Sequence, residues 1–255
     1  GGSDLHLADR RHPTIRVGGF LIPLTTKPML SQVDTEGFLD ALLTPVNKKI
    51  FLETKEMDFS YAYGEESRFR GNCFFQKGTV GIVLRLISRN IKTLAELGLP
   101  PILEQFAQKE QGFFLAVGPV GQGKTTTLAS LIELINQERA AHIITIEDPI
   151  EYVFDPKKSM IDQREVRIDT NDFHTALKSV FRQDVDVLMV GEMRTYETMS
   201  AAVTAAETGH LVFSTLHTNN AAQTIDRIID SFPSDQQDQI RTQLSESLTG
   251  IFSQR

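Results

Sequence analysis

Residues 118–126 read GPVGQGKTT and fit the pattern G-x-x-x-x-G-K-[ST], which describes a loop that wraps nucleotide phosphates. Glycines at 118, 121 and 123 let the backbone curl until its N–H groups converge on an anion. Lys124 can reach the outer phosphates, and the Thr125 hydroxyl can hold a magnesium ion. The residues predicted to contact the nucleotide are Gly118, Pro119, Val120, Gly121, Gln122, Gly123, Lys124, Thr125 and Thr126.

The segments on either side of this loop are those that the motif requires. Residues 113–117, FFLAV, form the short apolar run typical of a buried parallel strand. After the loop, Leu128, Leu131, Ile132 and Ile135 recur at the spacing of one helix face. The order strand, glycine loop, helix therefore favours a nucleotide site over a chance glycine turn between two core elements.

The composition limits the class of protein. The 255 residues suffice for one large or two modest domains, and 40% apolar with 23% charged residues is typical of a soluble globular chain. No apolar run approaches the ~18 residues that span a bilayer. The net charge of −7 argues against nucleic acid as the main partner. The single cysteine, Cys73, excludes an internal disulfide and a multi-cysteine zinc site, and we interpret it as a small buried apolar side chain.

The chain changes its pattern near residue 90, which predicts a domain of residues 1–90, a linker over 88–92 and a second domain of residues 91–255. The first region reads as β-rich and antiparallel, and the second alternates strands and helices, which implies a parallel sheet covered on both faces. In the first region we expect hairpins over 14–24 and 58–76 (with a polar turn at 64–66), a helix over 36–43 and a strand over 79–87. In the second we expect strands at 113–117, 143–146, 187–190 and 211–215, and helices at 124–137, 172–182, 195–207, 221–229 and 234–252.

Parallel sheets bind ligands beyond the carboxyl ends of their strands, and the predicted strands lead there into reactive side chains. Glu147 with Asp148 follows one strand, Glu192 another and His217 a third. Glu192 can orient or deprotonate the attacking water or hold the metal's water shell, and Glu147 can share the metal. The alternative for each carboxylate is a solvated loop group, and Asp148, which precedes Pro149, is equally suited to a turn.

Two further sets of residues are candidates for phosphate contacts. His210 begins the strand that His217 follows, about 23 Å away along extended chain, so both imidazoles cannot readily reach one γ-phosphate. His217 is therefore the candidate γ-phosphate sensor, and His210 is as well suited to a structural or interface role. Arg68 and Arg70 share one face of a predicted strand and Arg85 lies on the next, where guanidinium groups suit phosphate oxygens; the alternative is a solvated sheet face.

Several segments resemble a known family. SDLHL, SRFRGN, GPVGQGKTTTLAS, IITIEDPIEYVF, QREV, VGEMR and TAAETGHLVFSTLHT come in the order found in type IV pilus retraction ATPases. The chain thus resembles the twitching-motility branch of the secretion ATPase superfamily over nearly its whole length. The resemblance implies an α/β fold: a RecA-like P-loop NTPase domain with a parallel sheet, preceded by a smaller α+β PAS-like domain.

The resemblance also implies a function. It implies a cytoplasmic homohexameric ring at the cytoplasmic face of the inner membrane, which binds ATP and Mg²⁺ between the two domains of each subunit. The ring is expected to hydrolyse ATP, to engage the inner-membrane pilus platform protein and to drive pilus retraction and twitching motility. Association with the membrane is expected to be peripheral, only through such partners, and no nucleic-acid partner is expected.

The family's site residues carry over by matching positions. The resemblance assigns phosphate binding to Lys124, magnesium to Thr125, an acidic box to Glu147, catalysis to Glu192, a histidine box to His210 and His217, and phosphate-approaching arginines to Arg68, Arg70 and Arg85. We therefore predict metal contacts from Thr125, Glu147 and Glu192. The predicted catalytic residues are Glu192, Glu147, His217, Arg68, Arg70 and Arg85. Related assembly and type II secretion ATPases usually carry an extra N-terminal domain and a four-cysteine metal site, against which one cysteine argues.

Family members also have a helix before SDLHL and a C-terminal helical region with a retraction-associated motif, so we expect a truncated chain. Four other functions stay open. They are an accessory retraction or secretion-type traffic ATPase, a nucleotide-gated scaffold with little hydrolysis, a GTP switch and a small-molecule kinase. The GTP switch lacks an N-K-x-D pattern after the loop, and the kinase lacks an evident acceptor-binding domain.

Overall fold

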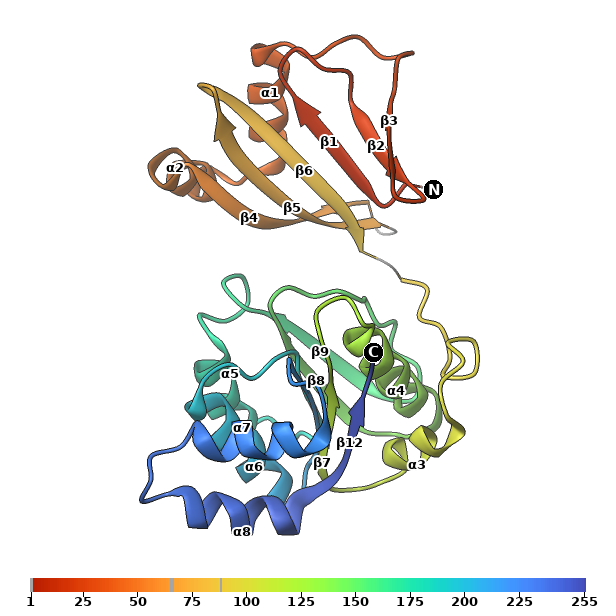
Figure 1. Ribbon diagram of the computed structural model, residues 1–255. Helices are drawn as coiled ribbons and strands as arrows, with labels where there is room; N and C mark the ends of the chain where they lie inside the picture. Colours follow the sequence, from red (N-terminus) through yellow and green to blue (C-terminus); the bar gives the residue numbers. More distant parts are fainter. Residues whose placement is uncertain (1, 65–66, 88) are drawn as a thin grey trace. The chain divides into compact units, whose positions relative to one another are not determined.

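Two β-sheets of opposite type make up the computed structural model, which describes residues 2–64, 67–87 and 89–255 (Figure 1). The chain divides into two compact units, Gly1–Ser88 and Arg89–Arg255, each held together by contacts within itself. Ser88, where the predicted linker begins, lies outside the described residues, as do residues 65 and 66 of the predicted turn. Among the described helices, none is long and apolar enough to cross a membrane.

The first unit is a six-stranded antiparallel sheet in the order β3-β2-β1-β6-β5-β4, packed against two helices. This confirms the antiparallel α+β architecture predicted for the region. The strand β1 was not predicted from the sequence. Its elements are β1 Asp4–Ala8, β2 Thr14–Val17, β3 Phe20–Pro23, α1 Gln32–Leu42, α2 Pro45–Thr54, β4 Glu56–Tyr63, β5 Ser67–Gln76 and β6 Thr79–Ile87.

Side-chain caps determine where the two helices begin. The Ser31 hydroxyl accepts from the Asp34 backbone N–H while the Asp34 carboxylate accepts from the Ser31 N–H, so α1 begins at Gln32 rather than at the predicted residue 36. The Thr44 hydroxyl accepts from the third residue of α2, which opens with Pro45. The apolar pattern misses α2 because its apolar residues do not form one buried face: Val46, Ile50 and Leu52 are exposed.

The core of the first unit lies between the sheet and the helices. Phe51 of α2 is fully buried and stacks on Phe75 with ring centroids 4.9 Å apart. Cys73 is also fully buried, as its interpretation as a small apolar side chain requires. Across β4 and β5, Phe59 is the register partner of Gly71, and its ring covers the space that a side chain at 71 would occupy.

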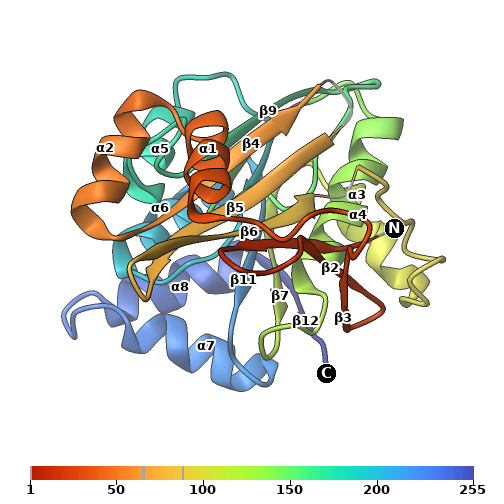
Figure 2. The ribbon, with the colours of Figure 1, turned by 90° about the horizontal axis from the view of Figure 1, so that it is seen from above.

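The second unit is a six-stranded, all-parallel sheet in the order β12-β7-β11-β10-β8-β9. Helices cover both faces: α3 and α4 lie on one side, and α5, α6, α7 and α8 lie on the other (Figure 2). This confirms the predicted RecA-like architecture. Its elements are η1 Pro101–Leu103, α3 Glu104–Ala107, β7 Gly112–Val117, α4 Lys124–Glu138, β8 His142–Glu147, β9 Met160–Glu165, α5 Phe173–Val180, β10 Val187–Val190, α6 Tyr196–Glu207, β11 Leu211–Leu216, α7 Ala221–Asp230, α8 Gln237–Ser247 and β12 Leu248–Ser253.

Two strands differ from the sequence prediction. The helix expected over 234–252 is wrong at its end, because α8 stops at Ser247 and β12 pairs in parallel with β7. Gly250 lies where the β12–β7 register shifts, and the Phe106 ring leaves no room there for a side chain. The edge strand β9 was not expected because its residues, MIDQRE, are mostly polar and carry no apolar run.

The packing of Phe59 over Gly71 predicts a measurable loss of stability. A Cβ built on Gly71 would lie 2.2 Å from the buried Phe59 ring, so Gly71→Ala must displace that ring from the core. Overpacking of this kind lowers the free energy of unfolding by about 1–3 kcal/mol. Urea denaturation followed by far-UV circular dichroism should show the loss.

Gly37 in α1 supplies the matched control, because a Cβ there meets open space within a helix. Gly37→Ala should therefore leave the free energy of unfolding unchanged or raise it by roughly 0.5–1 kcal/mol. Equal effects of the two substitutions would contradict the packing assigned to Phe59.

Candidate functional site

The carboxyl ends of neighbouring strands gather reactive groups at one edge of the second sheet. β7, β11 and β10 lie side by side in parallel, and they lead into the glycine loop, His217 and Glu192. β8, next to β10, ends at Glu147. The structure thus brings the loop, the imidazole and a carboxylate together, at the edge where parallel sheets bind ligands.

The glycine loop curls back over the start of α4. Gly121 and Gly123 have φ angles of +81° and +80°, in the left-handed region that favours glycine, and Gly123 is the N-cap of α4. No side chain caps this helix, so its first N–H groups remain available to an anion. Pro119 and Val120 at the tip of the loop are exposed. The loop has the shape that phosphate binding requires.

Gly118 is constrained by a strand that the sequence prediction missed. A Cβ built on Gly118 would lie 2.2 Å from the backbone oxygen of Gln254, just past the end of β12. The Gln254 N–H donates to the Val117 carbonyl at 2.8 Å, and its side-chain Oε1 accepts from the Thr127 hydroxyl at 3.0 Å. The residue after β12 therefore contacts both the start of the loop and the first turn of α4.

Lys124 lies under the loop with its ammonium group close to the expected phosphate position. Its Nζ donates to the Gly118 and Pro119 carbonyls, both at 2.9 Å, and lies 3.4 Å from His217 Nδ1. Only 6% of the residue is exposed. Burial lowers the pKa of Lys124, while the charges of Glu151 and Glu192 oppose that shift. The Gly118 and Pro119 carbonyls of the loop thus hold the ammonium group in this structure.

Glu192 lies beside His217 and is held by an arginine. Its Oε2 is 2.9 Å from Arg194 Nε and 3.7 Å from His217 Nε2. The Glu192 side chain is 17% exposed, so a mostly buried carboxylate is compensated by a guanidinium from the same loop. Because His217 also approaches Lys124, one imidazole bridges the loop cation and the carboxylate.

Glu147 and Glu151, both in the segment IEDPIEY, differ in their surroundings. Glu147 is buried and accepts from the Thr145 hydroxyl at 2.6 Å, the Gln163 amide at 3.3 Å and the Glu151 N–H at 3.4 Å. Burial raises the pKa of Glu147 to about 7. Glu151 is exposed and is the acid whose charge acts most strongly on Lys124. The sequence prediction named Glu147 and missed Glu151, four residues later.

The remaining candidates are His210, which lies away from the loop within the second unit, and three arginines of the first unit. His210 precedes β11 at the opposite end from His217, and its Nδ1 contacts the Ala205 carbonyl at 2.9 Å. In the first unit, Arg70 and Arg85 are register partners on adjacent strands, as their predicted grouping requires. Arg85 also forms an ion pair with Asp4 at 2.8 Å. Arg68 lies two residues before Arg70 and so faces the same side of β5.

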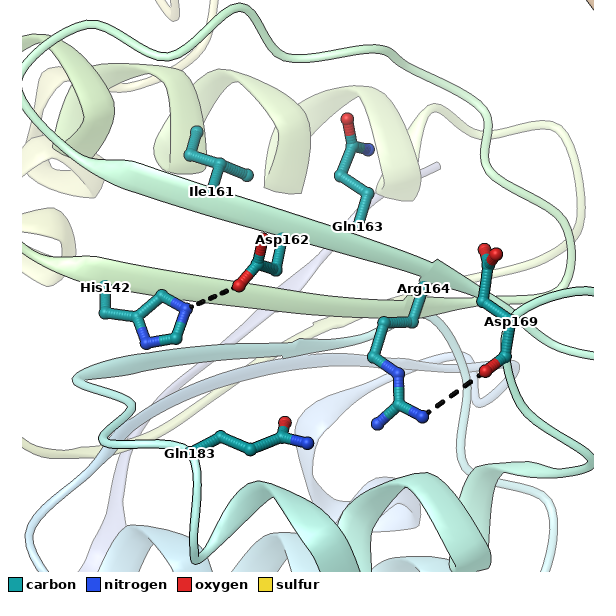
Figure 3. A pocket seen from close by; sticks show the side chains of 7 residues that line it. All are labelled: His142, Ile161, Asp162, Gln163, Arg164, Asp169 and Gln183. Atoms are coloured by element: carbon teal, nitrogen blue, oxygen red, sulfur yellow. Dashed lines mark hydrogen bonds and ion pairs between the residues drawn. The ribbon is translucent and has the colours of Figure 1, made fainter.

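A hollow of about 580 Å³ lies on the open edge formed by β8 and β9 (Figure 3). His142 Nε2 lies 3.0 Å from Asp162 Oδ2, and His142 Nδ1 lies 3.0 Å from the Asp184 carbonyl. Arg164 donates to the Asp169 carbonyl in the same hollow. His142 with Asp162, and Arg164 with the Asp169 carbonyl, thus pair with one another inside this hollow.

Comparison with known proteins agrees with this geometry. Residues 55–255 match the family described as type II/IV secretion system protein. This chain belongs to that family. It is 43% identical, over its whole length, to a Pseudomonas aeruginosa protein described as a type IV pilus retraction ATPase, PilT, and spans 74% of that protein. It is 45% identical to a Neisseria gonorrhoeae twitching motility protein, covering 95% of this chain and 64% of that relative.

A solved structure has the same arrangement of elements. The crystal structure of a pilus retraction motor, PilT, with bound ADP matches the whole chain with a TM-score of 0.96 and 46% identity, and the match covers 74% of that protein. The sequence-based prediction of a PilT-like member of the secretion ATPase superfamily is therefore confirmed. We therefore take the glycine loop, rather than the hollow at His142, as the candidate functional site.

The ring of His142 predicts a pH-dependent contribution to stability. Burial disfavours its charged form, but the hydrogen bonds to Asp162 and to the Asp184 carbonyl outweigh that penalty and raise its pKa above 6.5. A histidine whose pKa is raised by folding stabilises the protein fully below the unfolded pKa and loses that effect as the pH rises through the folded pKa. Between about pH 6 and 8, the wild-type free energy of unfolding should therefore fall more than that of His142→Gln.

Urea midpoints at these pH values measure the difference. Glu147, with a pKa of about 7, titrates in the same pH range but is present in both proteins. Subtracting the two pH profiles of the free energy of unfolding therefore isolates the contribution of His142. Asp162→Asn should reproduce much of the effect of His142→Gln, because it removes the carboxylate that favours the charged imidazole. Parallel pH profiles in wild type and His142→Gln would show that the ion pair does not form.

Proposed function

We propose that this chain is the ATP-hydrolysing subunit of a motor that retracts type IV pili and powers twitching motility. One observation carries the proposal: the loop lysine, an imidazole and a carboxylate form a continuous cluster. Lys124 Nζ lies 3.4 Å from His217, and His217 lies 3.7 Å from Glu192. Phosphoryl transfer depends mainly on positioning and electrostatic stabilisation of this kind. The relatives named for pilus retraction support the choice of motor.

The proposed ligand is ATP with Mg²⁺. In the described part of the chain no cluster of three or more His, Cys, Asp or Glu could enclose a metal ion. Thr125 in the first turn of α4 and Glu192 beyond β10 instead offer a few oxygen donors. Mg²⁺ suits such a site, because it is commonly held by one or two carboxylates together with substrate phosphates. When bound, the ion would neutralise charge on the transferring phosphoryl group.

Each residue of the cluster has a proposed role in hydrolysis. Lys124 exchanges its contacts with the loop carbonyls for contacts with phosphate oxygens and stabilises the charge that develops there. Glu192 orients and deprotonates the attacking water, with its carboxylate positioned by the ion pair to Arg194. His217 contacts both groups and is the proposed γ-phosphate sensor. The metal role predicted for Glu147 is better suited to Glu151, because Glu147 is buried with its oxygens already hydrogen-bonded.

The assembly and the partners are part of the same proposal. We infer a homohexameric ring at the cytoplasmic face of the inner membrane, bound to the pilus platform protein, on the basis of the family motifs. Arg68, Arg70 and Arg85 are proposed to approach the phosphates in the assembled ring, and His210 is proposed for the histidine box.

An accessory retraction motor is the second candidate. The chain is 42% identical, over 255 residues, to a Pseudomonas aeruginosa type IV pilus ATPase named PilU, close to its identity with the PilT relative. Both candidate functions, the main and the accessory retraction motor, require ATP hydrolysis at the same site. A scaffold that binds ATP without hydrolysing it is excluded if purified protein releases phosphate in the steady state.

Removing the loop cation should abolish turnover. Lys124→Ala leaves the phosphates without their ammonium partner, and steady-state phosphate release should fall by at least about 100-fold. Glu192→Gln keeps the shape of the carboxylate but cannot take up a proton, so turnover should fall similarly while nucleotide still binds. Lys157→Ala is the charge-matched control, because Lys157 pairs with Glu133 on the surface. Normal phosphate release by Lys124→Ala would refute the site.

The two glutamates of the acidic segment can be separated by substitution. Glu151→Gln removes the charge that acts most strongly on Lys124 and should lower kcat on the order of 10- to 100-fold. Glu147→Gln preserves the shape and, through its one oxygen, the hydrogen bonds from Thr145 and Gln163. The pKa of the buried carboxyl that it replaces is about 7, so its effect on kcat should be smaller. The opposite order of effects would return the metal role to Glu147.

A further inference from the structure

The two flanks of the glycine loop carry different chemistry. β7, which leads into the loop, pairs with β11 on one side and β12 on the other. His217 and, one strand farther, Glu192 follow the strands on the β11 side. On the β12 side the strand ends at Ser253 and the next residue is Gln254. In the proposed function the γ-phosphate faces the first flank, which leaves the second flank for the nucleoside.

Gln254 is positioned to meet that nucleoside. Its Oε1 accepts from the Thr127 hydroxyl at 3.0 Å, which orients the amide plane against the first turn of α4. Its Nε2 lies 3.9 Å from a Cβ built on Gly123, beside the loop. Within residues 2–64, 67–87 and 89–255, Nε2 donates no hydrogen bond. Two N–H donors are thus held at the edge of the loop without an acceptor.

The backbone around Gln254 is fixed, so this amide is not on a freely moving segment. Its N–H donates to the Val117 carbonyl at 2.8 Å, and its carbonyl lies against Gly118. The preceding Ser253 hydroxyl donates to the Asn219 carbonyl at 3.0 Å. β12 and the end of the chain run beside α4 (Figure 1). A side chain fixed at both its backbone and its Oε1 is preorganised for binding.

We propose that Gln254 is a nucleotide-binding residue whose Nε2 donates to the ribose or base of the bound nucleotide. This inference rests on the proposed function, since it concerns the same site. Ribose oxygens and ring nitrogens are acceptors, and an amide N–H₂ is a neutral donor suited to them. In this proposal the loop and Lys124 bind the phosphate groups of the nucleotide. Gln254 therefore adds affinity for nucleotides, and not for phosphate chains in general.

The test compares three ligands on one variant of the chain. A neutral hydrogen bond is worth about 0.5–1.5 kcal/mol, so Gln254→Ala should weaken ADP and ATP binding about 3- to 10-fold in titration calorimetry. Inorganic tripolyphosphate, which has no nucleoside, should bind the variant and the wild type equally. The KM for ATP should rise by the same factor, with kcat at saturating ATP unchanged.

Further variants keep the outcome decisive. Gln254→Glu retains the acceptor for Thr127 but lacks the N–H₂ donors, so it should lose at least as much ADP affinity as Gln254→Ala. Ser245→Ala, which removes a hydroxyl hydrogen bond within α8, should retain full affinity. Equal weakening of ADP and tripolyphosphate would show that Gln254 only shapes the loop, and unchanged ADP affinity would show that it contacts nothing; either result overturns the inference. Failure of the wild type to bind ADP would instead refute the proposed function.

Discussion

The parallel pairing of β7 with β11 and β12 is the constraint on which the site depends. β7 is buried throughout, and its register places Val117 beside Leu216 on one side and Ser253 on the other. The chain must turn sharply after Val117, because the Gln254 carbonyl fills the space beside Gly118. The glycine loop therefore begins at a point fixed from both sides, and α4 starts with its N–H groups aimed at the edge of the sheet.

Lys124 is buried, and the loop itself already holds its ammonium group in position. A buried ammonium is costly unless polar groups surround it, and here two loop carbonyls supply that compensation. Glu151 and Glu192 add opposite charge without direct contact, so the cation stays favourable but is not neutralised by a tight ion pair. In the proposed function, the phosphate oxygens of a bound triphosphate replace the neutral loop carbonyls as partners of Lys124. This preorganisation is what a positioned catalytic cation requires.

The sequence predicted the parts of the site that local patterns encode. The loop, the strand before it and the helix after it follow from glycine spacing and apolar periodicity, and Glu192 and His217 follow from their places after apolar runs. Gln254 could not be found in this way, because its role comes from a strand pairing across more than a hundred residues that periodicity had assigned to a helix. Glu151 and Glu147 differ only in burial, which the packing of β8 against β9 decides and which the sequence IEDPIEY does not reveal.

In the proposed mechanism, hydrolysis changes the contacts on one flank of the loop only. Loss of the γ-phosphate would remove a partner from Lys124, Glu192 and His217, whereas the nucleoside end of the nucleotide would keep its contacts. A ligand moves a conformational equilibrium only by its difference in affinity for the two states, so the signal of hydrolysis must leave through the β11 flank. His217 is separated by a short loop from α7, which begins at Ala221 and is capped by Asn220. The Ser253 hydroxyl also contacts this loop at Asn219. We therefore infer that a shift of the imidazole would reach the start of α7 through this short loop, so that a small displacement at the phosphate would move a rigid element.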